Sequence, residues 1–392
     1  MVGSAMKTII YVGGFELPDK NAAAHRVLNN AKCLRALGCR VVFLGISHTE
    51  KETSEQEYDG FRCVSVPYPQ GLGQWLGYLT DCTALKKLIG EEKPDGVIFY
   101  NYQAAALAKA LRYCKKRHIL TIADVTEWYL AEGNPIFRLI KTADTSLRMK
   151  RYHKRADGVI AISAYLEEYY RKDMGDRVVR IPPLIDKDEP KWADVPHGRR
   201  NDGRIRLIYA GSTTDIKDNI AVVLEGVFPY RDKVSLTVVG TSEADLGAYL
   251  REKGKEHLLG DYLEALGRLP HTECLKKIGE SDFQIFIRED NLVTRAGFPT
   301  KLGESFACGT PVITNPSSNV ADYMADGQTG YLVDGTDADA VRAVMQRVSG
   351  LTAEEILAMK EHCRGIGAFE YGTYIHVFDA FFKQIGAGNS DQ

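Results

Sequence analysis

The sequence has little that would place the protein among membrane, secreted or nucleic-acid-binding proteins. No apolar run approaches the roughly 18 residues of a membrane span, and the opening MVGSAM lacks the basic start and apolar stretch of a signal peptide. The eight cysteines form no CxxC pair, which argues against a zinc knuckle, a redox motif or a disulfide framework. A formal net charge of −2 gives no global attraction for nucleic acid. We therefore expect a cytoplasmic protein.

Metal and dinucleotide motifs are also missing. The nine histidines show no ligand spacing such as H-x-x-x-H, and the DKD at 186–188 lies in a charged stretch that is predicted to be a linker. The glycines of YVGGF at 11–15 follow a predicted strand, but the downstream residues do not complete G-x-G-x-x-G. These absences disfavour a nicotinamide dehydrogenase, and we expect neither a metal nor a cofactor.

What is present is a repeated alternation of short β-rich runs and helical patterns along 392 residues, a length that fits two domains. Such alternation predicts an α/β fold with two Rossmann-like, doubly wound parallel sheets. We predict an N-terminal domain at 1–185, a linker at 186–203 and a C-terminal domain at 204–365. The segment 366–392 contains a helical pattern that is expected to cross back to the N-terminal domain.

One stretch, RAGFPTKLGESFACGTPVITN at 295–315, reads as a loop, a short helix and a buried strand. Pro299 suits the first helical position, and the amides near Phe298, Thr300 and Lys301 would form an anion site at the positive helix end. Glu304 lies one turn further on, where its carboxylate can accept hydrogen bonds from ribose hydroxyls. This predicts a nucleotide site. The alternative is an ordinary intrahelical ion pair between Lys301 and Glu304.

Several stretches occur together in an order that carries a resemblance. They are YVGGF, ADGVIAIS (156–163), VVRIPPLID (178–186), YAGSTTDIK (209–217), LEALGRLPHTECLKKIGESDFQIFI (263–287), KLGESFACGTPVITN (301–315) and DGQTGYLVDG (326–335). In this order the chain resembles the retaining nucleotide-sugar glycosyltransferases of GT-B architecture, family 4. The resemblance implies two facing domains with a cleft between them. It also implies transfer of a sugar from a nucleoside-diphosphate donor to a saccharide or lipid-linked acceptor, in cell-surface polysaccharide or glycolipid synthesis.

By this resemblance Glu304 holds the donor ribose and Lys217 reaches the donor diphosphate. Loss of the sugar leaves negative charge on the phosphate, so fixed positive charge should catalyse the step, and Arg288 at a strand end is a second candidate. For Arg288 the alternative is a surface salt bridge with Glu289 or Asp290. The expected donor-binding residues are Gly13, Gly14, Gly211, Lys217, Arg268, Leu269, Arg295, Phe298, Pro299, Thr300, Lys301 and Glu304.

The N-terminal domain supplies the candidates on the acceptor or sugar side. Asp124 follows a predicted strand in TIADVTEW and is expected to face the cleft, where it would orient the acceptor hydroxyl or the sugar. Glu127 is the second choice for this role, and the alternative for Asp124 is a helix cap. Asn101 takes the place where the family often has a histidine.

The chain departs from the family pattern at three positions. Ser212 replaces the usual arginine after Gly211, Ala296 replaces a glutamate that meets the donor sugar, and Asn101 replaces the histidine. These departures keep two alternatives open: a nucleotide-sugar-binding protein that has lost catalysis, and a nucleotide-sugar epimerase of the same architecture. The residues do not specify the nucleotide base, the sugar or the acceptor.

A basic patch, IFRLIKTADTSLRMKRYHKR at 136–155, mixes apolar residues with arginines and lysines and predicts a basic amphipathic helix. Such a helix can rest on an anionic membrane surface and bring a lipid-linked acceptor to the enzyme. A core-packed helix with a solvated cationic face is the alternative. Peripheral contact with the inner face of the membrane is thus an expectation, whereas nucleic acid is not expected as a partner.

Overall fold

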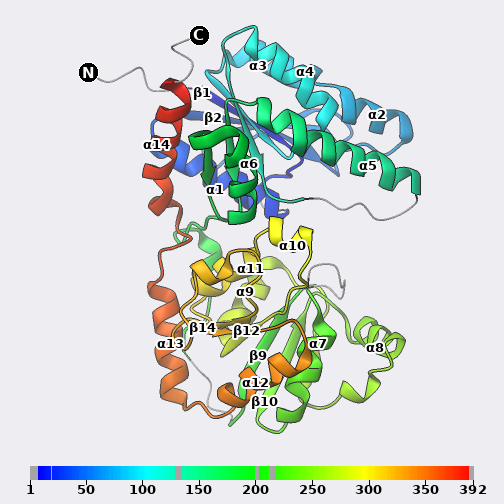
Figure 1. Cartoon of the computed structure of the whole chain (residues 1–392), viewed down its shortest axis with the longest axis vertical. Helices are drawn as coiled ribbons and strands as arrows, with labels where there is room; N and C mark the ends of the chain where they lie inside the picture. Colours follow the sequence, from blue (N-terminus) through cyan, green and yellow to red (C-terminus); the bar gives the residue numbers. More distant parts are fainter. Residues whose placement is uncertain (1–7, 19, 129–134, 199–202, 212–217, 388–392) are drawn as a thin grey trace. The chain divides into compact units, whose positions relative to one another are not determined.

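The computed structural model describes residues 8–18, 20–128, 135–198, 203–211 and 218–387. The chain divides into two compact units (Figure 1). The first comprises residues 1–184 together with 370–392, and the second comprises residues 185–369. In the described part of the chain no helix has both the length and the apolar character needed to cross a membrane.

The first unit is built on an eight-stranded sheet with the order β3-β4-β2-β1-β5-β6-β7-β8. Every pairing is parallel except that of β3 with β4, a hairpin that the sequence patterns did not predict. Asp59 and Gly60 make its two-residue turn with φ of 49° and 73°, the positive values that an Asp-Gly turn favours. The strands are β1 (Thr8–Gly13), β2 (Arg40–Ser47), β3 (Ser54–Tyr58), β4 (Phe61–Pro67), β5 (Gly96–Tyr100), β6 (Leu120–Val125), β7 (Gly158–Ala161) and β8 (Val178–Arg180).

Helices cover this sheet. The first helix has Asn21 as its N-cap, whose side chain accepts a hydrogen bond from the amide of Ala24. It packs with the C-terminal helix in one apolar cluster with β1 and β2. In Figure 1 these two helices, α1 and α14, run side by side. The helices are α1 (Ala22–Ala36), α2 (Leu72–Thr80), α3 (Thr83–Glu92), α4 (Ala104–Lys115), α5 (Pro135–Leu147), α6 (Ala164–Met174) and α14 (Tyr371–Ala387).

The second unit is built on a six-stranded, wholly parallel sheet with the order β11-β10-β9-β12-β13-β14. Gly330 is required where β14 meets β13, because it has a φ of 132° and an added Cβ would lie 1.9 Å from the carbonyl oxygen of Val312. The strands are β9 (Ile205–Ala210), β10 (Val234–Val239), β11 (Leu263–Ala265), β12 (Phe283–Ile285), β13 (Val312–Thr314) and β14 (Gly330–Leu332).

The helices of the second unit alternate with these strands. They are α7 (Ile220–Val227), α8 (Glu243–Glu252), α9 (His271–Glu280), α10 (Leu292–Ala296), α11 (Thr300–Ala307), α12 (Ala338–Val348) and α13 (Ala353–Gly365). The described part of the predicted linker belongs to this unit: Val195 is buried and packs with Ile278 and Cys308. The two doubly wound parallel sheets confirm the predicted fold class.

Candidate functional site

Positive charge gathers in the second unit near the carboxyl ends of β9 and β12, where ligands of open α/β sheets bind. Lys301, in the first turn of α11, forms an ion pair with Asp218. Arg288, just after β12, places its Nε 3.7 Å from Oδ1 of the same carboxylate. The Asp218 carboxylate therefore pairs with both Lys301 and Arg288, and the three side chains together carry a net positive charge.

This cluster is shielded from water. The exposed fraction of the side chain is 5% for Arg288, 14% for Asp218 and 20% for Lys301. Burial lowers the pKa of Arg288, and the charge of Asp218 opposes that shift. The side chain of Asn315 makes two hydrogen bonds to the backbone of Arg288. Its Oδ1 accepts a bond of 2.9 Å from the Arg288 N–H, and its Nδ2 donates a bond of 2.9 Å to the Arg288 carbonyl oxygen. The guanidinium itself contacts Asp218 and donates from Nη1 to the carbonyl oxygen of Thr294 at 3.4 Å. A charge fixed in this way can stabilise a developing negative charge.

Gly211 lies directly beside the Lys301 ammonium. A Cβ added at Gly211 would sit 2.8 Å from Lys301 Nζ and 3.2 Å from the ring of Tyr209. Any larger residue would have to displace the ammonium, so the glycine after β9 leaves room for a charged group rather than only for a turn.

Glu304 lies on α11, one turn after Lys301. Its Oε1 is 3.2 Å from Nε2 of His271, the first residue of α9, and both side chains are about one-third exposed, at 28% and 33%. Lys301 and Glu304 thus each pair with a group on another element. The helix starts at Thr300, so Pro299 is its N-cap rather than the predicted first helical residue, a one-residue shift.

The other predicted donor residues have different surroundings. Arg295 forms a two-pronged ion pair with Asp290, at 2.6 and 2.7 Å. Phe298 is buried against the ring of Phe369, with centroids 5.9 Å apart, and fixes the chain just before α11. Arg268 is exposed after β11, next to Leu269, which packs on a core cluster. The predicted roles of Lys217 and Ser212 fall outside the described residues.

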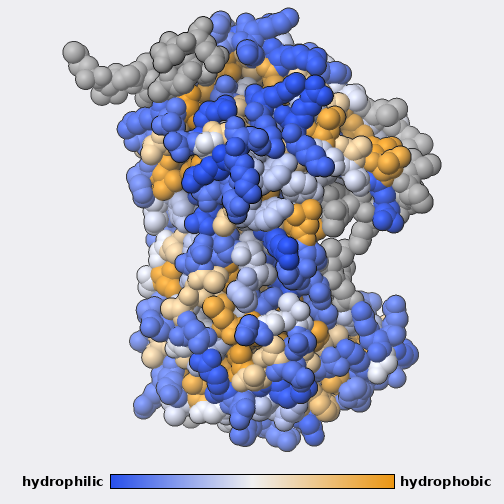
Figure 2. All heavy atoms as spheres, viewed as in Figure 1, coloured by the Kyte–Doolittle hydropathy of each residue, from blue (hydrophilic) through white to orange (hydrophobic). Residues whose placement is uncertain are grey.

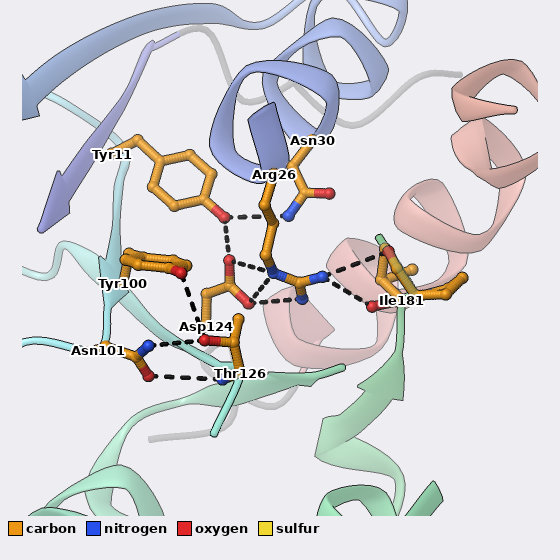
Figure 3. A network of polar contacts seen from close by, with 9 residues as sticks. Tyr11, Arg26, Asn30, Tyr100, Asn101, Asp124, Thr126 and Ile181 are labelled. Carbon is orange, nitrogen blue, oxygen red and sulfur yellow. Dashed lines mark hydrogen bonds and ion pairs between the residues drawn. The ribbon is translucent and has the colours of Figure 1, made fainter. Parts of the chain in front are cut away.

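In the first unit, Asp124 is part of a buried polar network (Figure 3). Its side chain has no exposed surface, and its Oδ1 accepts a hydrogen bond of 2.7 Å from Nη2 of Arg26. Tyr11 donates its hydroxyl proton to Oδ2, and Asn30 donates to the Tyr11 oxygen at 3.1 Å. The prediction that Asp124 faces a cleft is therefore wrong, because both its oxygens are engaged inside the unit.

The remaining first-unit candidates line the neighbouring strand ends. Asn101 has a φ of 43°, a conformation that asparagine tolerates, and its Nδ2 donates to Thr126 Oγ1 at 2.7 Å. Glu127 follows β6 and is partly exposed. A Cβ at Gly13 would lie 2.4 Å from the carbonyl oxygen of Tyr100, so strand packing alone explains that glycine. Gly14 lies close to the hydroxyl of Tyr78.

Sequence reasoning missed two residues that pair with predicted site residues of the second unit. Asp218 directly follows the predicted lysine in TTDIKDN, and His271 opens the helix after β11. Both follow the carboxyl ends of strands, so a search of every such loop for titratable residues would have found them. Their partners, Lys301 and Glu304, lie 83 and 33 residues away along the chain.

Comparisons with known proteins agree with this arrangement. Residues 23–189 match the model of Glycosyltransferase Family 4, and residues 204–350 match the model of Glycosyl transferases group 1. The chain is a GT-B glycosyltransferase of family 4, group 1.

Relatives of this glycosyltransferase include two mannosyltransferases of Mycolicibacterium smegmatis. The phosphatidyl-myo-inositol mannosyltransferase is 24% identical over 340 residues, which are 84% of this chain and 81% of the relative. The GDP-mannose-dependent α-(1-6)-phosphatidylinositol monomannoside mannosyltransferase is 26% identical, over 75% of this chain and 78% of the relative. Both matches span most of the two proteins compared.

Solved structures show the same fold. HepE from Anabaena, in complex with UDP and glucose, has a TM-score of 0.65 and 12% identity, covering 96% of this glycosyltransferase and 100% of the HepE chain. Sucrose-phosphate synthase from Thermosynechococcus elongatus has a TM-score of 0.69 and 15% identity, covering 97% and 100%. At these identities the likeness concerns the fold alone.

Proposed function

We propose that this glycosyltransferase moves a sugar from a nucleoside-diphosphate sugar to a hydroxyl of a saccharide or lipid-linked acceptor, with retention of the anomeric configuration. The observation that carries the proposal is the placement of Lys301 and Arg288 around Asp218, beside Gly211. A site with net positive charge at the carboxyl ends of parallel strands suits a diphosphate.

The donor would be held by groups of the second unit. The diphosphate would meet Lys301, Arg288 and the amides at the start of α11, while Glu304 would accept hydrogen bonds from the ribose. Asp218 pairs with both cations, and the diphosphate would compete with it for them. Lys217, which lies outside the described residues, stays a predicted contact to the diphosphate, and Arg268 and Arg295 stay predicted contacts to other parts of the donor.

The chemical step would use the same charges. As the bond from the anomeric carbon to the diphosphate breaks, negative charge grows on the departing oxygen, and cations already fixed by burial stabilise it without reorganisation. Retention follows if the acceptor hydroxyl attacks from the leaving-group face and the departing phosphate takes its proton. Such a mechanism needs no dedicated base, which agrees with the burial of Asp124.

The test measures donor binding and transfer on the full chain. GDP-mannose and UDP-glucose are the first donors to try, because a relative depends on GDP-mannose and a structural neighbour holds UDP. Glu304→Gln should weaken nucleotide binding by about tenfold or more, since a hydrogen bond to a charged group contributes about 1.5 to 3 kcal/mol. Glu361→Gln, an exposed change on α13, is the matched control.

Other outcomes would favour other functions. Interconversion of a nucleotide sugar without any acceptor would support the epimerase alternative. Nucleotide binding without transfer or donor hydrolysis would support a binding protein that has lost catalysis. Unchanged affinity in Glu304→Gln, with the fold intact, would remove this carboxylate from the donor site.

The proposal also includes contact of the first unit with an anionic membrane surface. Leu139, Ile140 and Leu147 on α5 are 72%, 46% and 41% exposed, and apolar surface is visible over α5 in Figure 2. Exposed Lys150 and Arg151 follow on the next turns. Exposed apolar side chains beside cations fit a surface of anionic lipid, which offers an apolar phase under negative headgroups.

A further inference from the structure

The first unit contains a pocket of about 410 Å³, and Gly13 is the one predicted site residue among the described residues that line it. Its floor consists of apolar side chains from three adjacent strands, among them Val12 of β1, Leu44 of β2 and Val66 of β4. Its wall consists of residues of α2 and of the turn into α3, including Gly77 and Tyr78. The volume lies in the range of small-molecule sites.

Polar groups occupy only part of the lining. Lys51, Gln74 and Asp81 are exposed, and the Asp81 carboxylate accepts hydrogen bonds from the amide and hydroxyl of Thr83, at 3.0 and 2.6 Å. These bonds lower the pKa of Asp81, so the carboxylate is charged at neutral pH. The pocket therefore joins an apolar floor to exposed charged and amide groups.

This division argues for an amphipathic ligand. The side chains of Val12, Leu44 and Val66 offer no hydrogen bonds, so a sugar placed on them would bury hydroxyls without partners, which is costly. An alkyl chain placed there would bind more favourably with every methylene group that it buries. A polar head joined to that chain would meet Lys51 and Gln74, whose ammonium and amide groups can donate hydrogen bonds to an anion.

The neighbouring helix supports the same ligand. Trp75, next to Gln74 on α2, lies under the ammonium of Lys141, whose Nζ is 5.4 Å from the ring centroid. Lys141 belongs to α5, the helix that also exposes Leu139 and Ile140. The helix that forms part of the pocket wall is thus contacted by α5, which carries the most exposed large hydrophobic side chain among the described residues, Leu139.

We infer that this pocket binds the apolar chain of a lipid-linked acceptor, with the anionic head at Lys51 and Gln74. The inference rests on the proposed transferase function and specifies its acceptor. A polyprenyl phosphate and a glycerophospholipid share the required chemistry of an apolar chain joined to a polar head. The two sources are distinguished by the probes.

The experiment is calorimetric binding to the full chain with two probes kept below their aggregation limits, farnesyl phosphate and dihexanoyl phosphatidylglycerol. At least one should bind with a negative heat capacity change, the mark of apolar burial. Binding of only one of the two would identify the source of the chain. Glycerol phosphate and methyl mannoside, which lack the chain, should not bind. If neither chain probe binds, or if a chainless compound binds as well as they do, the inference is wrong.

A pair of glycine substitutions localises the binding. Gly77 and Gly73 are both exposed on α2, and a Cβ at either would meet nothing within 4 Å, but only Gly77 lines the pocket. Gly77→Leu should weaken binding of the chain probe at least tenfold, whereas Gly73→Leu should change it less than twofold. Ala84→Leu, a second exposed lining position, should act like Gly77→Leu. Equal effects at Gly73 and Gly77 would overturn the assignment to this pocket.

Nucleotide binding measured on the same variants separates this inference from the proposed function. Gly77→Leu should leave the affinity for GDP and UDP unchanged, because those ligands are assigned to the second unit. Transfer to water-soluble acceptors with no binding of either chain probe would refute the pocket inference and leave the transferase proposal standing. Binding of a chain probe without any sugar transfer would refute the transferase proposal and leave the assignment of the chain to this pocket standing.

Discussion

Asp124 and Arg26 form a fully buried ion pair that ties β6 to α1, across 98 residues of sequence (Figure 3). Arg26 also donates from Nη1 to the carbonyl oxygens of Ile181 and Pro182, at 3.0 and 3.3 Å. The pair therefore joins three segments of the first unit. These contacts in the interior give the pair a structural role in the first unit.

Removing one member of this pair should destabilise the protein strongly. Asp124→Ala leaves the buried Arg26 guanidinium without its counter-ion, which typically costs 3 to about 5 kcal/mol of unfolding free energy. Urea unfolding measures the loss, and Asp176→Asn, an exposed change in the same unit, is the control. The double change Arg26→Met with Asp124→Leu should cost less than the sum of the two single changes. A stable Asp124→Ala variant that has lost transfer would restore the catalytic hypothesis.

Asp218→Asn should have opposite effects on donor affinity and on stability. It removes the anion that competes with a diphosphate for Lys301 and Arg288, so GDP and UDP should bind several-fold more tightly. It also leaves the buried Arg288 less well paired, so the melting temperature should fall. Calorimetry and thermal unfolding give the two readouts, with the exposed Asp261→Asn as control. Weaker nucleotide binding would mean that Asp218 is needed to orient the cations.

Membrane contact should depend on the exposed residues of the basic patch at 136–155, and not on every basic residue in it. Arg148 is buried and donates to the carbonyl oxygen of Asn101, and Lys154 pairs with Asp173. The changes expected to matter are Leu139→Ser with Ile140→Ser, and Lys150→Gln with Arg151→Gln. Each exposed basic residue near an anionic surface contributes about 1 kcal/mol, so either pair should lower vesicle affinity more than tenfold at low salt.

Sedimentation with phosphatidylglycerol-containing vesicles tests this prediction. Lys115→Gln with Lys116→Gln removes the same charge from the exposed end of α4 and should have little effect. Binding should fade as salt rises, because exposed charges are screened. If the unchanged protein does not bind acidic vesicles at low ionic strength, α5 does not dock on lipid.

Lys360 should make stability depend on pH. Its ammonium is buried and donates to the carbonyl oxygens of Gly279 and Ser281. Burial lowers its pKa from 10.5 to about 8, with Asp282 opposing and Arg206 adding to the shift. Between these two pKa values the unfolded chain holds a proton that the folded chain has lost, so stability from this group rises with pH.

The matched variant is Lys360→Met, which has no titrating group at this position. Relative to it, the unchanged protein should gain up to about 1.4 kcal/mol of unfolding free energy per pH unit between pH 8 and 10.5. Below pH 8 the difference should be flat. A difference that is constant across the whole range would show that the lysine titrates normally.

The sequence by itself was enough for the fold class and for part of the candidate site. Alternating apolar strands and helical patterns are local signals, so both parallel sheets could be predicted from them. Lys301 and Glu304 could be selected because they open a helix after a loop, where an anion site is expected on local grounds. The helix start moved by a single residue, to Thr300.

Only the tertiary structure decided which charges meet. The pairing of Lys301 with Asp218 and of Arg26 with Asp124 depends on how distant strands and helices pack, and no local pattern encodes that. The same holds for α5: periodicity shows that Leu139 lies on an apolar stripe, but not whether another element covers it. Local sequence preferences determine where each helix or strand forms and which of its sides is apolar. Which other element covers that side depends on packing across the whole unit.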